Sequence, residues 1–159
     1  MDNLQKKLIE ALVEAEKNWI SADHFIYVIY PAVKDEKLHL RVLENLYKSV
    51  VLTITSVLKF EFLHKRIDLT KDPKKNLEIF FNKCSKHYGI GEEDSILLKR
   101  VVFLGKKHKN SGFEFSRTGK IVILDDDLNT FILSSEDMKK LLVSVKRLID
   151  KVKIKFKDN

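Results

Sequence analysis

The stretch SVVLTITSVL, residues 49–58, decides whether this chain folds as a helical bundle or around a buried sheet. Its side chains are nearly all apolar or β-branched, and β-branched residues lower helix propensity, so a buried strand is the competing interpretation. The flanking sequence favours a helix, because apolar residues recur every three or four positions from Leu38 to about Ile67. A helix that is apolar all round must be enclosed. We therefore expect Val50 to Leu58 to be buried on all sides, in the centre of a bundle or in a dimer interface.

The N-terminal segment shows the same helical periodicity. Pro31 should kink or end this helix near Tyr30, because proline lacks an amide and its ring clashes with the preceding turn. The segment from Asn3 to Ile67 is thus predicted to form an antiparallel pair of long helices. Such a pair presents more apolar surface than one partner covers, which predicts a homodimer through residues 4–63. The N-terminal stripe consists of Leu4, Leu8, Leu12, Ala15, Trp19, Ala22, Ile26, Ile29 and Val33.

Three further helices follow. Asp72 and Pro73 have the residue types of an N-cap and a first helical position, and Gly89 is a natural stop. The next helix has an acidic first turn at 92–94 and a basic last turn at 106–109, as the helix dipole favours. Ser134 or Ser135 should cap a C-terminal helix, whose apolar stripe runs to Val152. The end, KVKIKFKDN (151–159), alternates strictly and is interpreted as a strand or a frayed basic tail.

The stretch HKNSGFEFSRTGKIVIL, residues 108–124, differs from its helical surroundings because it alternates and turns. We expect a β-hairpin with its turn at Thr118-Gly119, and a third short strand in TFIL, residues 130–133. Phe113 and Phe115, together with Ile121 and Ile123, are predicted to pack on the helices, leaving Arg117 and Lys120 at an exposed tip. GFEF (112–115) resembles the aromatic core of an RNA-recognition-motif strand, but Glu114 replaces a small residue there. The two phenylalanines are therefore interpreted as core residues.

These elements predict a mainly α fold in a single domain, residues 1–159. It would be a helical bundle with two long N-terminal helices, two shorter helices, a small β-hairpin or meander near 113–133 and a C-terminal helix. Only 5 glycines and 2 prolines occur in 159 residues, which favours long regular elements. No repeat or flexible linker is visible.

The net charge of +7 lies entirely in the second half of the chain. Residues 1–70 contain 10 basic and 10 acidic residues, whereas residues 71–159 contain 20 and 13. This asymmetry predicts that the second half meets a polyanion; the alternative is a lysine-rich surface that only keeps the protein in solution. A hairpin folding back on the preceding helix would gather Lys106, Lys107, His108, Lys109, Arg117 and Lys120. A second run of candidate contacts comprises Lys139, Lys140, Lys146 and Arg147.

Several chemistries lack the residues that they need. Cys84, the single cysteine, lies beside Phe80 and Phe81 and is interpreted as a buried structural thiol. The five histidines form no i, i+4 pair, and the aspartates at 125–127 are read as a solvated turn rather than a metal loop. No glycine-rich phosphate loop occurs. We therefore expect no cofactor, no metal site and no catalytic nucleophile. The N-terminus lacks a signal-peptide pattern and no apolar run could span a membrane, which predicts a cytoplasmic protein.

The architecture of residues 1–110 resembles the HEPN class of helical bundle domains, and SADHFIYVIYPAVKDEKLHL (21–40) is similar to small uncharacterised archaeal proteins. The HEPN resemblance implies dimerisation and, in many members, RNA cleavage by an Arg followed after four to six residues by a His. No histidine here has an arginine at that spacing, since Arg100 and His108 are separated by one residue too many. If the resemblance holds, it implies a member that does not cleave.

These observations rank three functions. The first is a non-catalytic helical protein that docks on structured RNA, such as ribosomal RNA, through the basic surface of the second half. The alternative is a protein–protein interaction or dimerisation module without nucleic-acid binding. The third is a ribonuclease of the HEPN type.

Overall fold

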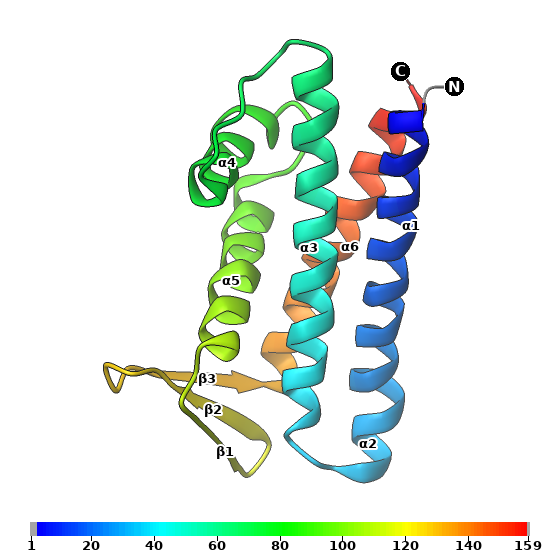
Figure 1. The fold of residues 1–159 in the computed structure, drawn as a ribbon. Helices are drawn as coiled ribbons and strands as arrows, with labels where there is room; N and C mark the ends of the chain where they lie inside the picture. The colour runs from blue at the N-terminus through cyan, green and yellow to red at the C-terminus, as the bar shows by residue number, and fades with distance from the viewer. Residues whose placement is uncertain (1–2, 159) are drawn as a thin grey trace.

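The structure, a computed structural model, describes residues 3–158 and is mainly helical (Figure 1). The sequence-based fold class is confirmed: two long N-terminal helices, shorter helices, a small meander and a C-terminal helix. The elements in chain order are α1 (Asn3–His24), the π-helical turn η1 (Phe25–Ile29), α2 (Tyr30–Val33), α3 (Leu38–Leu63), α4 (Pro73–Ile79), the π-helical turn η2 (Phe80–Cys84), α5 (Glu92–Lys109), β1 (Phe113–Arg117), β2 (Lys120–Leu124), β3 (Thr130–Ser134) and α6 (Ser135–Lys157).

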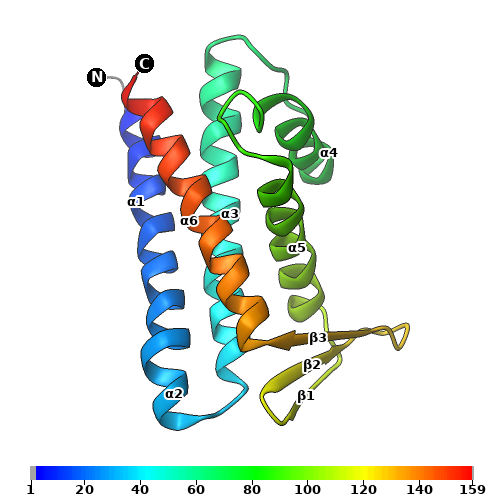
Figure 2. The ribbon, with the colours of Figure 1, turned by 180° about the vertical axis from the view of Figure 1, so that it is seen from behind.

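Helix α3 is the centre of the bundle, antiparallel to α1 and packed also against α5 and α6 (Figures 1 and 2). The predicted pair of long antiparallel helices is confirmed. Ser49 of α3 donates a hydrogen bond to the Ala15 carbonyl of α1 (2.7 Å), and Trp19 of α1 donates to the Leu142 carbonyl of α6 (2.8 Å). The described ends of α1 and α6 lie together at one end of the bundle, and the sheet lies at the other. We call the latter the sheet end.

The apolar centre of α3 is helical, as expected, but the prediction that Val50 to Leu58 is buried on all sides is wrong for burial within the bundle. Ile54 is 3% exposed, whereas Val51 is 39% exposed and Thr55 is also exposed. The reason is that α1, α5 and α6 leave one face of α3 uncovered. Thr53, on a covered face, donates its hydroxyl to the Ser49 carbonyl (2.7 Å), which offsets the cost of burying it.

The sequence predicts that the first helix kinks or ends near Pro31; it does not end at Tyr30, and its regular α-helical geometry is instead interrupted by η1 just before the proline. A widened turn makes room for a ring that would otherwise clash with the carbonyl four residues earlier. The helix then ends at Val33, where Lys34 takes a left-handed conformation (φ 56°) and donates its amide to the Tyr30 carbonyl (2.7 Å).

Residues 151–157 form neither a strand nor a frayed tail, contrary to expectation, because α6 continues to Lys157; Asn159 lies outside the described residues. Val152 is fully buried, and the Phe156 ring packs on Phe60 with centroids 4.6 Å apart. These two side chains continue the helical stripe of α6, and that burial outweighs the local alternation.

No helix among residues 3–158 is long and apolar enough to cross a membrane.

The three strands form an antiparallel sheet in the order β1-β2-β3, with the predicted turn at Thr118-Gly119 and the predicted third strand. Gly119 supplies the positive φ (+72°) that the turn requires. The predicted packing of the phenylalanines is wrong. Phe115 pairs with Val122 and Phe113 with Leu124, and paired residues share a face of the sheet. Ile121 and Ile123 therefore lie on the opposite face, where they are buried, while Phe113 is 58% exposed.

Candidate nucleic-acid interface

The last turn of α5 carries Lys106, Lys107, His108 and Lys109, where cations favour the helix dipole. The structure divides these residues into two kinds. Lys107 and His108 bind carboxylates of neighbouring elements. Lys106 and Lys109 are exposed and have no carboxylate partner among residues 3–158. Only the second kind presents an uncompensated charge to a phosphate.

His108 fastens β1 to α3. Its Nε2 lies 2.8 Å from Glu44 of α3 and its Nδ1 lies 2.5 Å from Glu114 of β1. Burial disfavours the charged imidazole, but the hydrogen bonds to the two carboxylates outweigh burial and raise the His108 pKa above its ordinary value. A charged ring held between two carboxylates is a structural tie, and its charge is already balanced inside the protein.

Lys107 is held in a similar way. Its ammonium lies 3.1 Å from Asp125 in the turn between β2 and β3, and it sits 5.5 Å and 5.7 Å from the ring centroids of Phe103 and Phe131. Asp125 also accepts hydrogen bonds from the Asn129 backbone and side chain. Lys107 thus anchors the β2–β3 turn to α5, and its charge is compensated there.

The hairpin tip is exposed but fixed. Arg117 and Lys120 are exposed and face each other across the turn, and neither has a carboxylate partner in the part of the chain that the structure describes. The Gly119 amide donates to the Glu36 carboxylate (3.0 Å), which ties the tip to the segment between α2 and α3. The Arg117 guanidinium also lies 5.8 Å from the Phe115 ring centroid.

The sequence predicted that these six residues of α5 and the hairpin form a single cluster. In the structure they do not. Strand β1 leads away from α5 and places the tip at its far end. A strand of this length spans roughly 14 Å. The sheet end therefore has two separate groups of uncompensated cations: Lys106 and Lys109 at one end of β1, and Arg117 and Lys120 at the other.

The candidate residues of α6 are mostly engaged. Arg147 lies 3.1 Å from buried Asp94, which also accepts a hydrogen bond from Ser144 (2.7 Å). Lys146 pairs with Asp150 (3.1 Å), Lys139 with Glu136 (3.6 Å). Their ammonium groups also lie 5.2 Å from the ring centroids of aromatic residues of the N-terminal helical segment: Lys146 from Trp19 and Lys139 from Tyr27. Lys140 is exposed and has no carboxylate partner among residues 3–158.

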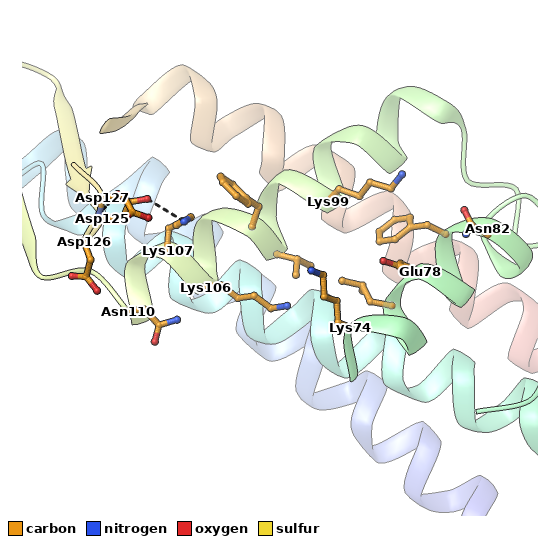
Figure 3. Close-up of a pocket in the computed structure, with 14 residues that line it drawn as sticks. Lys74, Glu78, Asn82, Lys99, Lys106, Lys107, Asn110, Asp125, Asp126 and Asp127 are labelled. Atoms are coloured by element: carbon orange, nitrogen blue, oxygen red, sulfur yellow. Dashed lines mark hydrogen bonds and ion pairs between the residues drawn. The ribbon is translucent and has the colours of Figure 1, made fainter. Parts of the chain in front are cut away.

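A groove of about 600 Å³ beside α5 contains basic residues that the sequence interpretation missed (Figure 3). It lies between α4, η2, α5 and the β2–β3 turn. Lys74 of α4 and Lys99 of α5 join Lys106 and Lys107 there, over an apolar floor that includes Phe81 and Phe103. Lys99 and Lys106 are seven residues apart on one helix, so the sequence could have predicted that they share a face. Lys74 reaches the same groove only because α4 lies beside α5, which the sequence pattern does not predict. Acidic residues line the groove too: Glu78, Asp125, Asp126 and Asp127.

Cys84 has the environment of a structural thiol, as expected. It is 2% exposed, and burial, followed by the nearby charge of Glu61, raises its pKa to about 11. A thiol with that pKa is protonated at neutral pH and is a poor nucleophile. Among residues 3–158, no group of three or more His, Cys, Asp or Glu side chains could hold a metal ion.

Comparison with known proteins adds no family: neither a family model nor a curated protein matches this chain.

Proposed function

We propose that the protein binds structured RNA, with ribosomal RNA as one candidate, through the cations of the sheet end. The observation that carries this proposal is the hairpin tip. Arg117 and Lys120 are exposed and uncompensated, and the bond from Gly119 to Glu36 holds their turn in place. A cation on a fixed turn loses less conformational entropy on meeting a phosphate than one on a mobile loop. Such contacts position a nucleic acid without reading its sequence.

The second group of cations supports the same partner. Lys106 and Lys109 lie at the other end of β1, so a chain of phosphates laid along this strand meets a cation at each end. Lys107, His108, Lys139, Lys146 and Arg147 contribute less, because each already faces a carboxylate. With one cysteine and no disulfide, the chain suits the reducing cytoplasm, where we place this binding.

The test is a salt titration of RNA affinity. The double change Arg117→Ala with Lys120→Ala should weaken binding and make the slope of log affinity against log salt shallower by about two, one unit for each lost phosphate contact. Melting should hardly change, because exposed charges contribute little to stability. The matched control is Lys6→Ala with Lys7→Ala, which removes the same charge from exposed positions of α1.

The tip is not an RNA contact if its double variant binds with the parental affinity and slope. If the α1 control weakens RNA binding to the same extent, affinity depends on the net charge of the protein and not on the hairpin tip. We also expect the RNA to stay intact during long incubation with the protein. Progressive cleavage of the RNA by repeated preparations of the purified parent protein would instead assign it a ribonuclease activity.

A second candidate, a homodimer through residues 4–63, is favoured by an exposed apolar stripe on the first helical segment. Val13 and Ile20 lie seven residues apart in α1, the spacing of a helix that packs on a helical partner, and exposed Tyr27 follows in η1. The inner faces of α3, by contrast, are covered within the chain by α1, α5 and α6. The exposed large apolar residues of this segment are Ile9 (42%), Val13 (51%), Ile20 (55%), Tyr27 (49%), Val28 (56%) and Val33 (62%).

Light scattering tests the dimer. The parent should have twice the 18.6 kDa mass of the chain at micromolar concentration, and Val13→Glu should return it to the monomer. Val143→Glu, at a similarly exposed position of α6 (46%), is the control and should stay dimeric. A parent that already has the monomer mass contradicts this candidate.

A further inference from the structure

The sheet presents to solvent a face that carries aromatic rings and cations and no acid. The strand register fixes its members, since residues paired across strands share a face and alternate residues point the other way. The opposite face, with Ile121, Ile123 and Leu133, packs on the helical core. We call the first the outer sheet face: Phe113, Phe115 and Arg117 of β1; Lys120, Val122 and Leu124 of β2; and Thr130, Ile132 and Ser134 of β3.

Two large apolar side chains of this face are exposed. Phe113 is 58% exposed and Ile132 is 44% exposed. The rings of Phe113 and Phe115 lie 5.6 Å apart at an angle of 48°. Val122, between Phe115 and Ile132 in the register, is only 1% exposed and supports them from the middle strand. The two exposed side chains, Phe113 and Ile132, flank the middle strand on one face of the sheet, which makes that face a candidate binding surface.

The surrounding charge identifies the class of occupant. Arg117 and Lys120 stand on this same face at its turn end, and none of its members is acidic. An occupant that satisfies both features has flat apolar groups at regular intervals along a negatively charged backbone. Single-stranded nucleic acid has this chemistry, because its unpaired bases offer their faces to aromatic side chains while its phosphates meet cations. A duplex hides those base faces within its own stack.

We propose that the outer sheet face binds an unpaired segment of the RNA, with a base stacked on Phe113 and the adjoining phosphates at Arg117 and Lys120. This rests on the proposed function and narrows it to a loop, bulge or single-stranded end. Stacking is tolerant of base identity, so the face selects unpaired over paired RNA rather than one sequence over another.

The experiment measures fluorescence anisotropy of a labelled oligouridine and of a labelled duplex of the same length, with the full chain. The parent should bind the single strand more tightly. Phe113→Ala should weaken single-strand binding by roughly 5- to 150-fold, with an unchanged salt slope because no phosphate contact is lost. Phe62→Ala is the control: Phe62 is 49% exposed, near the end of α3 remote from the sheet, and its loss should change nothing. Phe113→Leu, which keeps an apolar side chain on the strand, should show the same loss if the ring is what binds.

The outcomes separate this inference from the function on which it rests. Parental affinity in both Phe113 variants, with salt-dependent binding retained, overturns the stacking face and leaves RNA binding standing. No salt-dependent binding of either RNA by the parent overturns both. A parent that is dimeric, and that Phe113→Leu makes monomeric without a change in RNA affinity, assigns the face to a second copy of the chain and overturns the inference.

Discussion

Single residues at the sheet end hold it to the helices, and His108 is the clearest case. Its pKa is raised above the ordinary 6.5 because the folded protein holds the ring between Glu44 and Glu114. In the window from pH 6.5 up to that raised pKa the folded state retains a proton that the unfolded chain has lost. The stabilisation is therefore complete below about pH 6.5 and is lost as pH rises through the folded pKa. Melting of the parent and His108→Gln across this range should show the parent's advantage shrinking with pH; a constant difference contradicts this.

The pKa of His39 is shifted in the opposite direction, so its effect on the pH dependence of stability is opposite to that of His108. His39 is fully buried, with Nδ1 2.9 Å from the Glu36 carbonyl and Nε2 3.0 Å from the Ser135 hydroxyl. Burial lowers its pKa below 6.5. The unfolded chain then binds a proton first, so stability should be lost as pH falls from about 6.5 through the folded pKa. In His39→Gln this acid-side loss should be smaller than in the parent, as melting below pH 6.5 would show; an equal loss in both proteins would exclude the assignment.

Gly105 permits the close packing of α5 on α3. A Cβ at this position would lie 2.3 Å from Cδ2 of Tyr47 and 2.6 Å from its Cγ. Alanine favours a helix over glycine by about 1 kcal/mol, but overpacking of a well-filled site typically costs about 1–3 kcal/mol. Gly105→Ala should thus destabilise the protein on balance, as measured by urea unfolding. In a Tyr47→Ala background the same change should become stabilising, and purely additive effects of the two changes would exclude the contact as the cause.

At the scale of the elements, a buried and an exposed position of α3 should respond differently to truncation. Ile54→Ala removes a side chain that is 3% exposed and should cost about 2–5 kcal/mol of unfolding free energy. Val51→Ala, one turn away and 39% exposed, should cost under about 1 kcal/mol. Equal costs in urea titrations would mean that both residues are enclosed, in a dimer or otherwise.

Helical periodicity in the sequence predicted the elements well, because burial of one stripe is what stabilises a helix. The same principle exposes the errors. Val152 and Phe156 continue the stripe of α6, so periodicity already contained the correct assignment of the chain end that local alternation obscured. Likewise, a two-residue turn at Thr118-Gly119 pairs Phe115 with Val122, which by itself excludes a shared face with Ile121.

Across the whole molecule, the sequence showed where the excess of positive charge lies. It did not show which of these cations are already paired with carboxylates. Ion pairs such as Arg147 with Asp94 and His108 with Glu44 join residues that lie far apart in the chain. The sequence pattern does not show which distant residues form ion pairs. The sequence-based prediction therefore overestimated the number of uncompensated cations on α6 and in the last turn of α5. It also missed the exposure of Phe113, since an aromatic residue in an alternating strand is usually buried. Uncompensated cations and an exposed aromatic ring, that of Phe113, lie together at the sheet end.

The most direct test of RNA binding at the sheet end is to map where RNA touches the chain. The full-length protein would be photocrosslinked to a single-stranded RNA, digested with trypsin and analysed by mass spectrometry. Cleavage after Lys109 and Arg117 yields the peptide NSGFEFSR, residues 110–117, which contains the exposed Phe113 and the half-buried Phe115. We predict that this peptide carries the dominant nucleotide adduct. The double variant Arg117→Ala with Lys120→Ala loses two tryptic sites and yields residues 110–139 instead, and we predict fewer adducts on that longer peptide than on residues 110–117 of the parent. Adducts confined to peptides of α1, or an RNA that forms no adduct with the sheet end at any salt concentration, would contradict the account.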